Sequence, residues 1–113
     1  VANYVPVTDA MLRNPDPADW LMIRHDYQSS SYSPLGQITT TNVGQMRLAW
    51  SWAMTDGAVL GNQPAPIVHN GVLYVNNNGG VLQALDAKSG DIIWENRYGA
   101  AATWPSMRSL PPP

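Results

Sequence analysis

The sequence predicts an all-β fold of short antiparallel strands, and three observations support this prediction. Apolar runs of four or five residues alternate with clear turn signals over the second half of the chain. Asn70-Gly71 is the strongest two-residue hairpin signal that a sequence can carry. The run Val72-Leu73-Tyr74-Val75 has no polar alternation, so both faces of that strand should be covered. Strands of this kind are typical of a propeller or a sandwich, and the continuous apolar strand favours the propeller.

The region before the strands is rich in turns and holds only short helical signals. Thr8 and Asp9 can cap a short helix that ends at Arg13. The run Asp16-Pro17-Ala18-Asp19 is a second helix start signal, with a carboxylate at the cap, proline at the first helical position and an acid in the first turn. Capping explains both carboxylates of this signal better than a catalytic pair does. Residues 27–34 are expected to form a loop rich in Ser and Tyr.

The middle of the chain is predicted to hold one helical turn followed by one strand. Residues 39–42 offer caps for a short turn of helix that reaches Met46. Residues 48–54 then follow as an aromatic-rich strand, in which two tryptophans alternate with a serine. Asp56-Gly57 is expected to end this strand.

Four antiparallel strands are predicted in the last part of the chain, over residues 66–69, 72–75, 81–85 and 92–96. Asp86 and Gly90 bracket the final reversal. Asp86 can bond the backbone ahead of it, and Gly90 can adopt the positive φ that a hairpin of this length needs. Trp94 follows at a fixed distance behind this turn and is expected to belong to the core.

Composition narrows the classes of function. The chain has 113 residues, enough for one domain at most. Charged residues make up 12% of it, the formal net charge is −2, and the six basic residues are scattered, so nucleic acid is not an expected partner. The absence of cysteine excludes disulfides and thiolate metal sites within the chain. No apolar run approaches the roughly 20 residues that a membrane span needs.

The sequence offers no metal site. His25 and His69 have no second histidine or carboxylate at ligand spacing, so each is expected to be a surface or strand residue. The low charge, together with five tryptophans and five tyrosines, favours a chain that buries much of its surface against something larger.

One motif within the predicted strands resembles a known family. Ala84, Asp86, Lys88, Gly90 and Trp94 have the spacing of the tryptophan-docking motif of the pyrroloquinoline quinone (PQQ) propeller proteins. In those proteins the tryptophan of one blade packs against the next blade. A chain with one copy of this motif is therefore expected to be one segment of a ring.

The rest of the chain resembles the N-terminal part of the PQQ-dependent alcohol dehydrogenase (quinoprotein) family. The matching stretches are residues 16–22, 32–35, 38–50 and 66–75. The resemblance implies an eight-bladed propeller with PQQ stacked at its centre. The missing initial methionine and the single motif lead us to expect a processed or cut segment. Such a segment needs the remaining propeller blades, or self-association, to cover the faces of its sheet.

The same resemblance divides the chain into four parts. Residues 1–47 correspond to an N-terminal arm with short helical turns, and residues 48–54 to the outer strand of the last blade, which closes the ring. Residues 62–98 correspond to blade one, and residues 99–113 to the start of blade two. The end is atypical, because the family continues an inner strand where Pro111-Pro112-Pro113 remove three backbone donors.

Two residues are assigned to the cofactor by resemblance. Gln63 stands where the family usually has a glutamate that reaches the polar edge of the quinone. Arg108 stands where an arginine of the second blade pairs with PQQ, and a guanidinium suits bidentate recognition of carboxylates or quinone oxygens. The glutamine keeps an acceptor but removes a charge. The vicinal cysteine pair found in many relatives would fall at Ala102-Thr103, and some relatives lack it.

The function implied by the resemblance is that of a periplasmic oxidoreductase. The chain would be the N-terminal part of a PQQ-dependent dehydrogenase that oxidises a small alcohol to an aldehyde or ketone. In this family a Ca²⁺ or lanthanide ion polarises a quinone carbonyl, and an aspartate acts as base. Those groups lie outside this chain, so no residue here is assigned to catalysis or metal binding, and the isolated segment is expected to be inactive.

The alternative is a non-catalytic scaffold. Propellers with PQQ-like repeats also serve protein–protein contacts, as in bacterial outer-membrane assembly lipoproteins. The arm from Asp16 to Trp50 favours the enzyme, because the scaffold proteins lack an arm of this form. Gln63 and the missing cysteines favour the scaffold.

Overall fold

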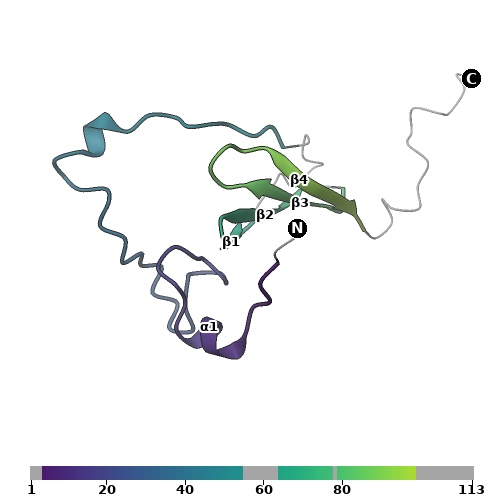
Figure 1. Cartoon of the computed structure of the whole chain (residues 1–113), viewed down its shortest axis with the longest axis horizontal. Helices are drawn as coiled ribbons and strands as arrows, with labels where there is room; N and C mark the ends of the chain where they lie inside the picture. The colour runs from purple at the N-terminus through teal and green to yellow at the C-terminus, as the bar shows by residue number, and fades with distance from the viewer. Residues whose placement is uncertain (1–3, 55–63, 78, 99–113) are drawn as a thin grey trace, which may run out of the picture.

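A four-stranded antiparallel sheet forms the centre of the structure, a computed structural model that describes residues 4–54, 64–77 and 79–98. The strands follow one another in the sheet in chain order: β1 (Ile67–His69), β2 (Val72–Asn77), β3 (Val81–Asp86) and β4 (Ile92–Arg97). Two short helices, α1 (Asp9–Arg13) and η1 (Val43–Gln45), lie in the arm that precedes the sheet. Figure 1 shows this arm as a long loop that extends well away from the strands. The prediction of an all-β fold with short helical turns is confirmed.

The turns form where the sequence predicts them. Asn70 and Gly71 have φ values of 49° and 74°, the two positive values of a type I′ hairpin turn, and they join β1 to β2. Gly90 has a φ of 80°. The Oδ1 atom of Asp86 accepts hydrogen bonds from the backbone N–H groups of Lys88 and Ser89, each at 2.9 Å. These bonds, the one from Ser89 first, lower the pKa of Asp86 because they favour its charged form.

The two predicted helix starts in the arm have different outcomes. The side chain of Thr8 accepts a hydrogen bond from the backbone N–H of Met11, which confirms the cap of α1. The prediction of a second helix at Asp16 is wrong, because the side chain of Asp16 accepts from the N–H of Ala18 at 2.8 Å and closes a tight turn. Trp20, just beyond this turn, must be extended to pair with β1.

The arm covers the free edge of β1. Trp20 and Val68 exchange both backbone hydrogen bonds, at 2.8 and 2.9 Å, in an isolated antiparallel bridge. This bridge satisfies backbone groups that would otherwise remain open at the edge of the sheet. It also places the tight turn at Asp16 beside the β1–β2 hairpin.

The predicted strand over residues 48–54 does not pair with the described sheet, and its assignment to the last blade stays a prediction. A strand requires a backbone ladder, and in the described part of the chain these residues form none. Two tryptophan side chains hold the segment instead. The Nε1–H of Trp50 donates to the carbonyl of Ala87 at 3.1 Å, and the Nε1–H of Trp52 donates to Oε1 of Gln83 at 3.2 Å.

The core lies along β2 and β3. Ala84 and Leu85 are fully buried and point to opposite faces of β3. Val72 and Val75 are buried on opposite faces of β2, whereas Leu73 and Tyr74 between them are half-buried, so the prediction that both faces of this strand are covered is met only in part. Most of β4 is exposed, and Trp94 within it is only half-buried. The expectation that Trp94 belongs to the core is therefore met only in part. None of the helices in the described residues has the length or apolar character that crossing a membrane requires.

Candidate functional site

The two residues assigned to the cofactor lie outside the described residues. The roles assigned to Gln63 and Arg108 are therefore still predictions. The position of the missing cysteine pair and the three terminal prolines also lie outside the described residues. Within the described ranges, no group of three or more His, Asp or Glu side chains could hold a metal ion. The informative geometry lies on the two faces of the sheet and at the β1–β2 hairpin.

Trp50 lies on the turn between β3 and β4. Its indole N–H reaches the carbonyl of Ala87, and its ring lies directly over Gly90. A methyl group at Gly90 would be 2.6 Å from Cδ2 and 2.8 Å from Cε3 of the indole. Only a residue without a side chain leaves room for the ring, so Gly90 provides both the positive φ of the turn and the surface that receives Trp50.

Trp52 is held on the same face of the sheet by a short polar network. Gln83 is 5% exposed and uses both ends of its amide. Its Oε1 accepts from Trp52, and its Nε2 donates to Oε2 of Glu95 at 2.9 Å. Arg97 donates to the other oxygen of Glu95 at 3.2 Å. Because the amide is satisfied at both ends, its burial carries no penalty for unpaired polar atoms.

The opposite face of the sheet is apolar and lines an open cavity. Tyr74, Ala84 and Trp94 stand opposite one another on three adjacent strands. The rings of Tyr74 and Trp94 have centroids 6.1 Å apart, with the buried Ala84 between them along the sheet. Burial raises the pKa of Tyr74. The cavity measures about 510 Å³, and it is lined by Tyr4, Val7, Ile67, His69, Tyr74, Leu82 and Trp94.

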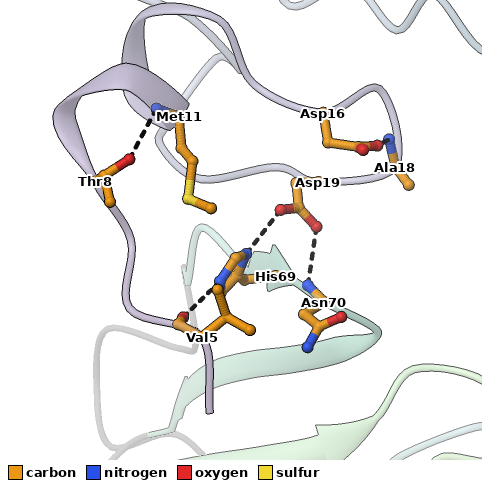
Figure 2. Close-up of polar contacts among 8 residues, drawn as sticks. All are labelled: Val5, Thr8, Met11, Asp16, Ala18, Asp19, His69 and Asn70. Atoms are coloured by element: carbon orange, nitrogen blue, oxygen red, sulfur yellow. Dashed lines mark hydrogen bonds and ion pairs between the residues drawn. The ribbon is translucent and has the colours of Figure 1, made fainter. Parts of the chain in front are cut away.

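His69 connects three separate parts of the chain (Figure 2). Its Nδ1 is 2.7 Å from Oδ2 of Asp19, and its Nε2 is 2.9 Å from the carbonyl oxygen of Val5. The other oxygen of Asp19 accepts from the backbone N–H of Asn70 at 2.9 Å. The hydrogen bond to Asp19 raises the pKa of His69, although its burial opposes this effect.

The expectation that Asp19 caps a helix is therefore wrong, whereas the expectation that His69 is a surface or strand residue is confirmed, because His69 is the last residue of β1. Asp19 does not cap a helix, because its two oxygens bind the β1–β2 hairpin. His69 is 5% exposed and is a buried, bonded residue of the strand. The contact between Asp19 and His69 could not be predicted from the spacing of residues in the sequence, because the two residues are 50 positions apart.

His25 is the other buried histidine, and the expectation that it is a surface or strand residue is wrong, because it is buried and lies in a bend outside the strands. It is 8% exposed, and its ring lies 4.6 Å from that of Trp20, centroid to centroid. Neither ring nitrogen makes a hydrogen bond within the described structure. The closest acidic group is the carboxylate of Asp26, 3.8 Å from Nδ1.

A four-stranded antiparallel meander with apolar side chains on both faces has the form of one blade of a β-propeller. Comparison with known proteins identifies the kind of propeller. The family model described as "PQQ: Glucose/ethanol/alcohol dehydrogenase, beta-propeller domain" matches residues 20–109. The chain belongs to this family, as its motif predicts.

Individual relatives agree with this assignment. The chain is 40% identical over 78 residues to the dehydrogenase subunit of the quinone alcohol dehydrogenase of Gluconobacter oxydans, which covers 69% of the chain and 10% of the relative. It is 39% identical over 80 residues to the quinohemoprotein alcohol dehydrogenase ADH-IIG of Pseudomonas putida, which covers 71% of the chain and 11% of the relative. The chain thus spans about a tenth of the length of these curated relatives.

Two solved structures share the fold. The quinohemoprotein alcohol dehydrogenase ADHIIG of Pseudomonas putida superposes with a TM-score of 0.67 and 35% identity, over 79% of this chain and 13% of that one. The quinohemoprotein alcohol dehydrogenase of Comamonas testosteroni superposes with a TM-score of 0.61 and 31% identity, over 78% of this chain and 14% of that one.

Proposed function

We propose that this chain is the N-terminal segment of a PQQ-dependent dehydrogenase that oxidises alcohols to aldehydes or ketones. The names of its relatives support this reaction class. The observation that carries the placement of this segment in the ring is the position of Trp50 on Gly90. In the PQQ propellers a tryptophan of one blade packs against the next blade, and Trp50 packs against the turn between β3 and β4 of the described sheet.

This contact supports the assignment of residues 48–54 to the last blade of an eight-bladed ring. In that arrangement Trp50 and Trp52 belong to the outer strand of the last blade, and the described sheet is blade one. The other face of the sheet, which carries Trp94, would then receive blade two. The 510 Å³ cavity on that face fits this role, because its lining is apolar and it is open.

The exposed side chains of the arm also support a larger ring. A run of large apolar groups is left in solvent along the arm, and an exposed series of this kind indicates a surface that another part of the protein or a partner covers. The exposed residues are Ile23, Tyr27, Tyr32, Leu35, Ile38, Val43, Met46 and Leu48. We propose that further blades cover them, in a periplasmic enzyme that is inactive without those blades.

Gln63 and Arg108 are the residues of this chain that we propose to contact PQQ. When bound, PQQ accepts the electrons taken from the alcohol. The role of Arg108 is to pair with carboxylates or quinone oxygens of the cofactor, and the role of Gln63 is to hydrogen-bond its polar edge. We propose that a Ca²⁺ or lanthanide ion is held by residues outside this segment. One relative, from Methylacidiphilum fumariolicum, is named a lanthanide-dependent methanol dehydrogenase.

Reconstitution tests this proposal. The intact protein, supplied with PQQ and Ca²⁺ or a lanthanide, is expected to reduce an artificial electron-accepting dye in the presence of primary or secondary alcohols. Arg108→Ala is expected to weaken PQQ binding by about 10- to 100-fold, because a hydrogen bond to a charged group contributes about 1.5–3 kcal/mol. Equilibrium dialysis of PQQ measures this loss.

Arg47→Ala is the matched control for Arg108→Ala. Arg47 is exposed and donates to the carbonyl of Met46 beside it, so its removal should leave PQQ affinity unchanged. A protein that takes up no PQQ and oxidises no alcohol with either metal would contradict the proposal. That result would favour the non-catalytic scaffold.

A further inference from the structure

The bonds of His69 require a particular protonation state. Its two ring nitrogens face Oδ2 of Asp19 and the carbonyl oxygen of Val5, at 2.7 and 2.9 Å. A carboxylate and a carbonyl only accept hydrogen bonds, so both ring nitrogens must carry a hydrogen for both bonds to form. That condition is met by the imidazolium and by neither neutral tautomer. The geometry alone therefore points to a charged histidine in this buried position.

We propose that His69 is a proton-dependent latch that holds the N-terminal segment, residues 4–8, against the β1–β2 hairpin. In the charged state, His69 joins this segment to Asp19 and to β1 at the same time. Figure 2 shows the three parts of the chain converging on the imidazole ring. Loss of one proton breaks this three-way connection at Val5.

The geometry determines which bond is lost. A neutral imidazole keeps a single N–H, and a carboxylate is a stronger acceptor than a backbone carbonyl. The N–H therefore stays on Nδ1, facing Asp19. The lone pair of Nε2 then faces the carbonyl oxygen of Val5, and two acceptors at 2.9 Å repel one another. The bond to Val5 is the one that opens.

Asp19 is the acidic group bonded to His69, and the other titratable groups line the cavities on either side of it. Asp19 binds it directly, and Asp16 lines the adjoining cavity together with Asp19, Asn70 and His69 itself. On the other side, the hydroxyl-bearing rings of Tyr4 and Tyr74 line the larger cavity with His69. The pKa of His69 is raised, first by the hydrogen bond to Asp19 and then by the bond to Val5, against the effect of burial.

The latch holds part of the lining of the larger cavity in place. The segment that it holds carries Tyr4 and Val7 into the lining of the cavity beside Tyr74 and Trp94. The segment also leads into α1, whose five residues are too few to stay helical without support. Opening at Val5 should therefore withdraw Tyr4 and Val7 from the lining of this cavity and loosen α1 together.

The sign of the pH dependence follows from linkage. A group whose pKa is higher in the folded state stabilises that state fully below its unfolded pKa, about 6.5 for histidine. This contribution is lost as the pH rises through the raised pKa of the folded state. The segment is therefore held at mildly acidic pH and released at alkaline pH.

Hydrogen–deuterium exchange of the intact protein tests the latch. The readout is the protection of a peptide covering residues 4–14, corrected for the intrinsic chemical rate at each pH. Protection should be constant below about pH 6.5. It should then fall by up to about tenfold per pH unit as the single proton is lost. A wild-type profile that is flat up to pH 9 overturns the proposal without any variant.

Two matched variants sharpen the test. In Asp19→Asn the amide N–H₂ can donate to Nδ1 of a neutral imidazole, while the amide oxygen still accepts from Asn70. His69 then keeps Nε2–H for Val5 at every pH, so the fall in protection should disappear. Asp16→Asn removes a carboxylate from the same cavity without touching His69 and should keep the wild-type profile. An Asp19→Asn profile identical to that of the wild type overturns the latch.

Discussion

Replacing Gly90 with alanine is expected to displace Trp50 and to lower the free energy of unfolding by about 2–4 kcal/mol. Two costs combine in this value. The residue has a φ of 80°, a conformation that costs a residue with a side chain about 1–2 kcal/mol. The new methyl group would also be 2.6 Å from Cδ2 of Trp50, so the indole must move and lose its bond to Ala87. Urea unfolding of the intact protein, followed by tryptophan fluorescence, measures the loss.

Gly79→Ala is the control that separates these two costs. Gly79 has nearly the same φ, 78°, but a methyl group there would have no atom within 4 Å. It should therefore show the backbone cost alone. Equal losses for Gly79→Ala and Gly90→Ala would mean that the contact between Trp50 and the turn contributes nothing to stability.

Leu85→Ala is the second substitution with a large expected effect. The side chain of Leu85 is fully buried within β3, between its cross-strand partners Leu73 and Ile92. Removing it leaves a cavity in the core along β2 and β3, and such changes cost about 2–5 kcal/mol. The same urea titration should show an earlier midpoint with an unchanged slope.

Leu48→Ala is the matched control for Leu85→Ala. It removes the same atoms from a side chain that the described residues leave 84% exposed, so any loss above about 0.5 kcal/mol measures burial of Leu48 against the proposed further blades. A loss at Leu48 as large as that at Leu85 would show that the arm is buried against something that the described residues do not include. A small loss at Leu85 would contradict the position of the core.

The features predicted correctly from the sequence are those that a few neighbouring residues determine. Asn70-Gly71 forms its hairpin because both residues tolerate positive φ. Asp86 and Gly90 close the next turn by local hydrogen bonds and by a second positive φ. Thr8 caps α1 through a bond that spans three residues. The family assignment succeeded for the same reason, since its motif lies within one strand–turn–strand unit.

The predictions that failed depended on contacts between distant parts of the chain. The residues that signal a helix start at Asp16 form a tight turn instead, because Trp20 pairs with Val68, 48 positions further along the chain. The pairing of Trp20 with Val68 also places the carboxylate of Asp19 within hydrogen-bond distance of His69. No local pattern encodes such pairings, so tertiary contacts overrode the helix propensity. The proposed cofactor contacts of Gln63 and Arg108 remain predictions, because both residues lie outside the described structure.

The attachment of Trp50 and Trp52 has a consequence for the order in which a ring would form. Their hydrogen bonds to Ala87 and Gln83 span only 37 and 31 positions, so the loops they close are short. If the ring closes as proposed, its closing segment is already seated on blade one while the later blades are still being synthesised. The last blade would then complete itself on a strand already in position. Ring closure would then add strands beside one that is already in place. The two ends of a long chain would not have to meet in the last step of folding.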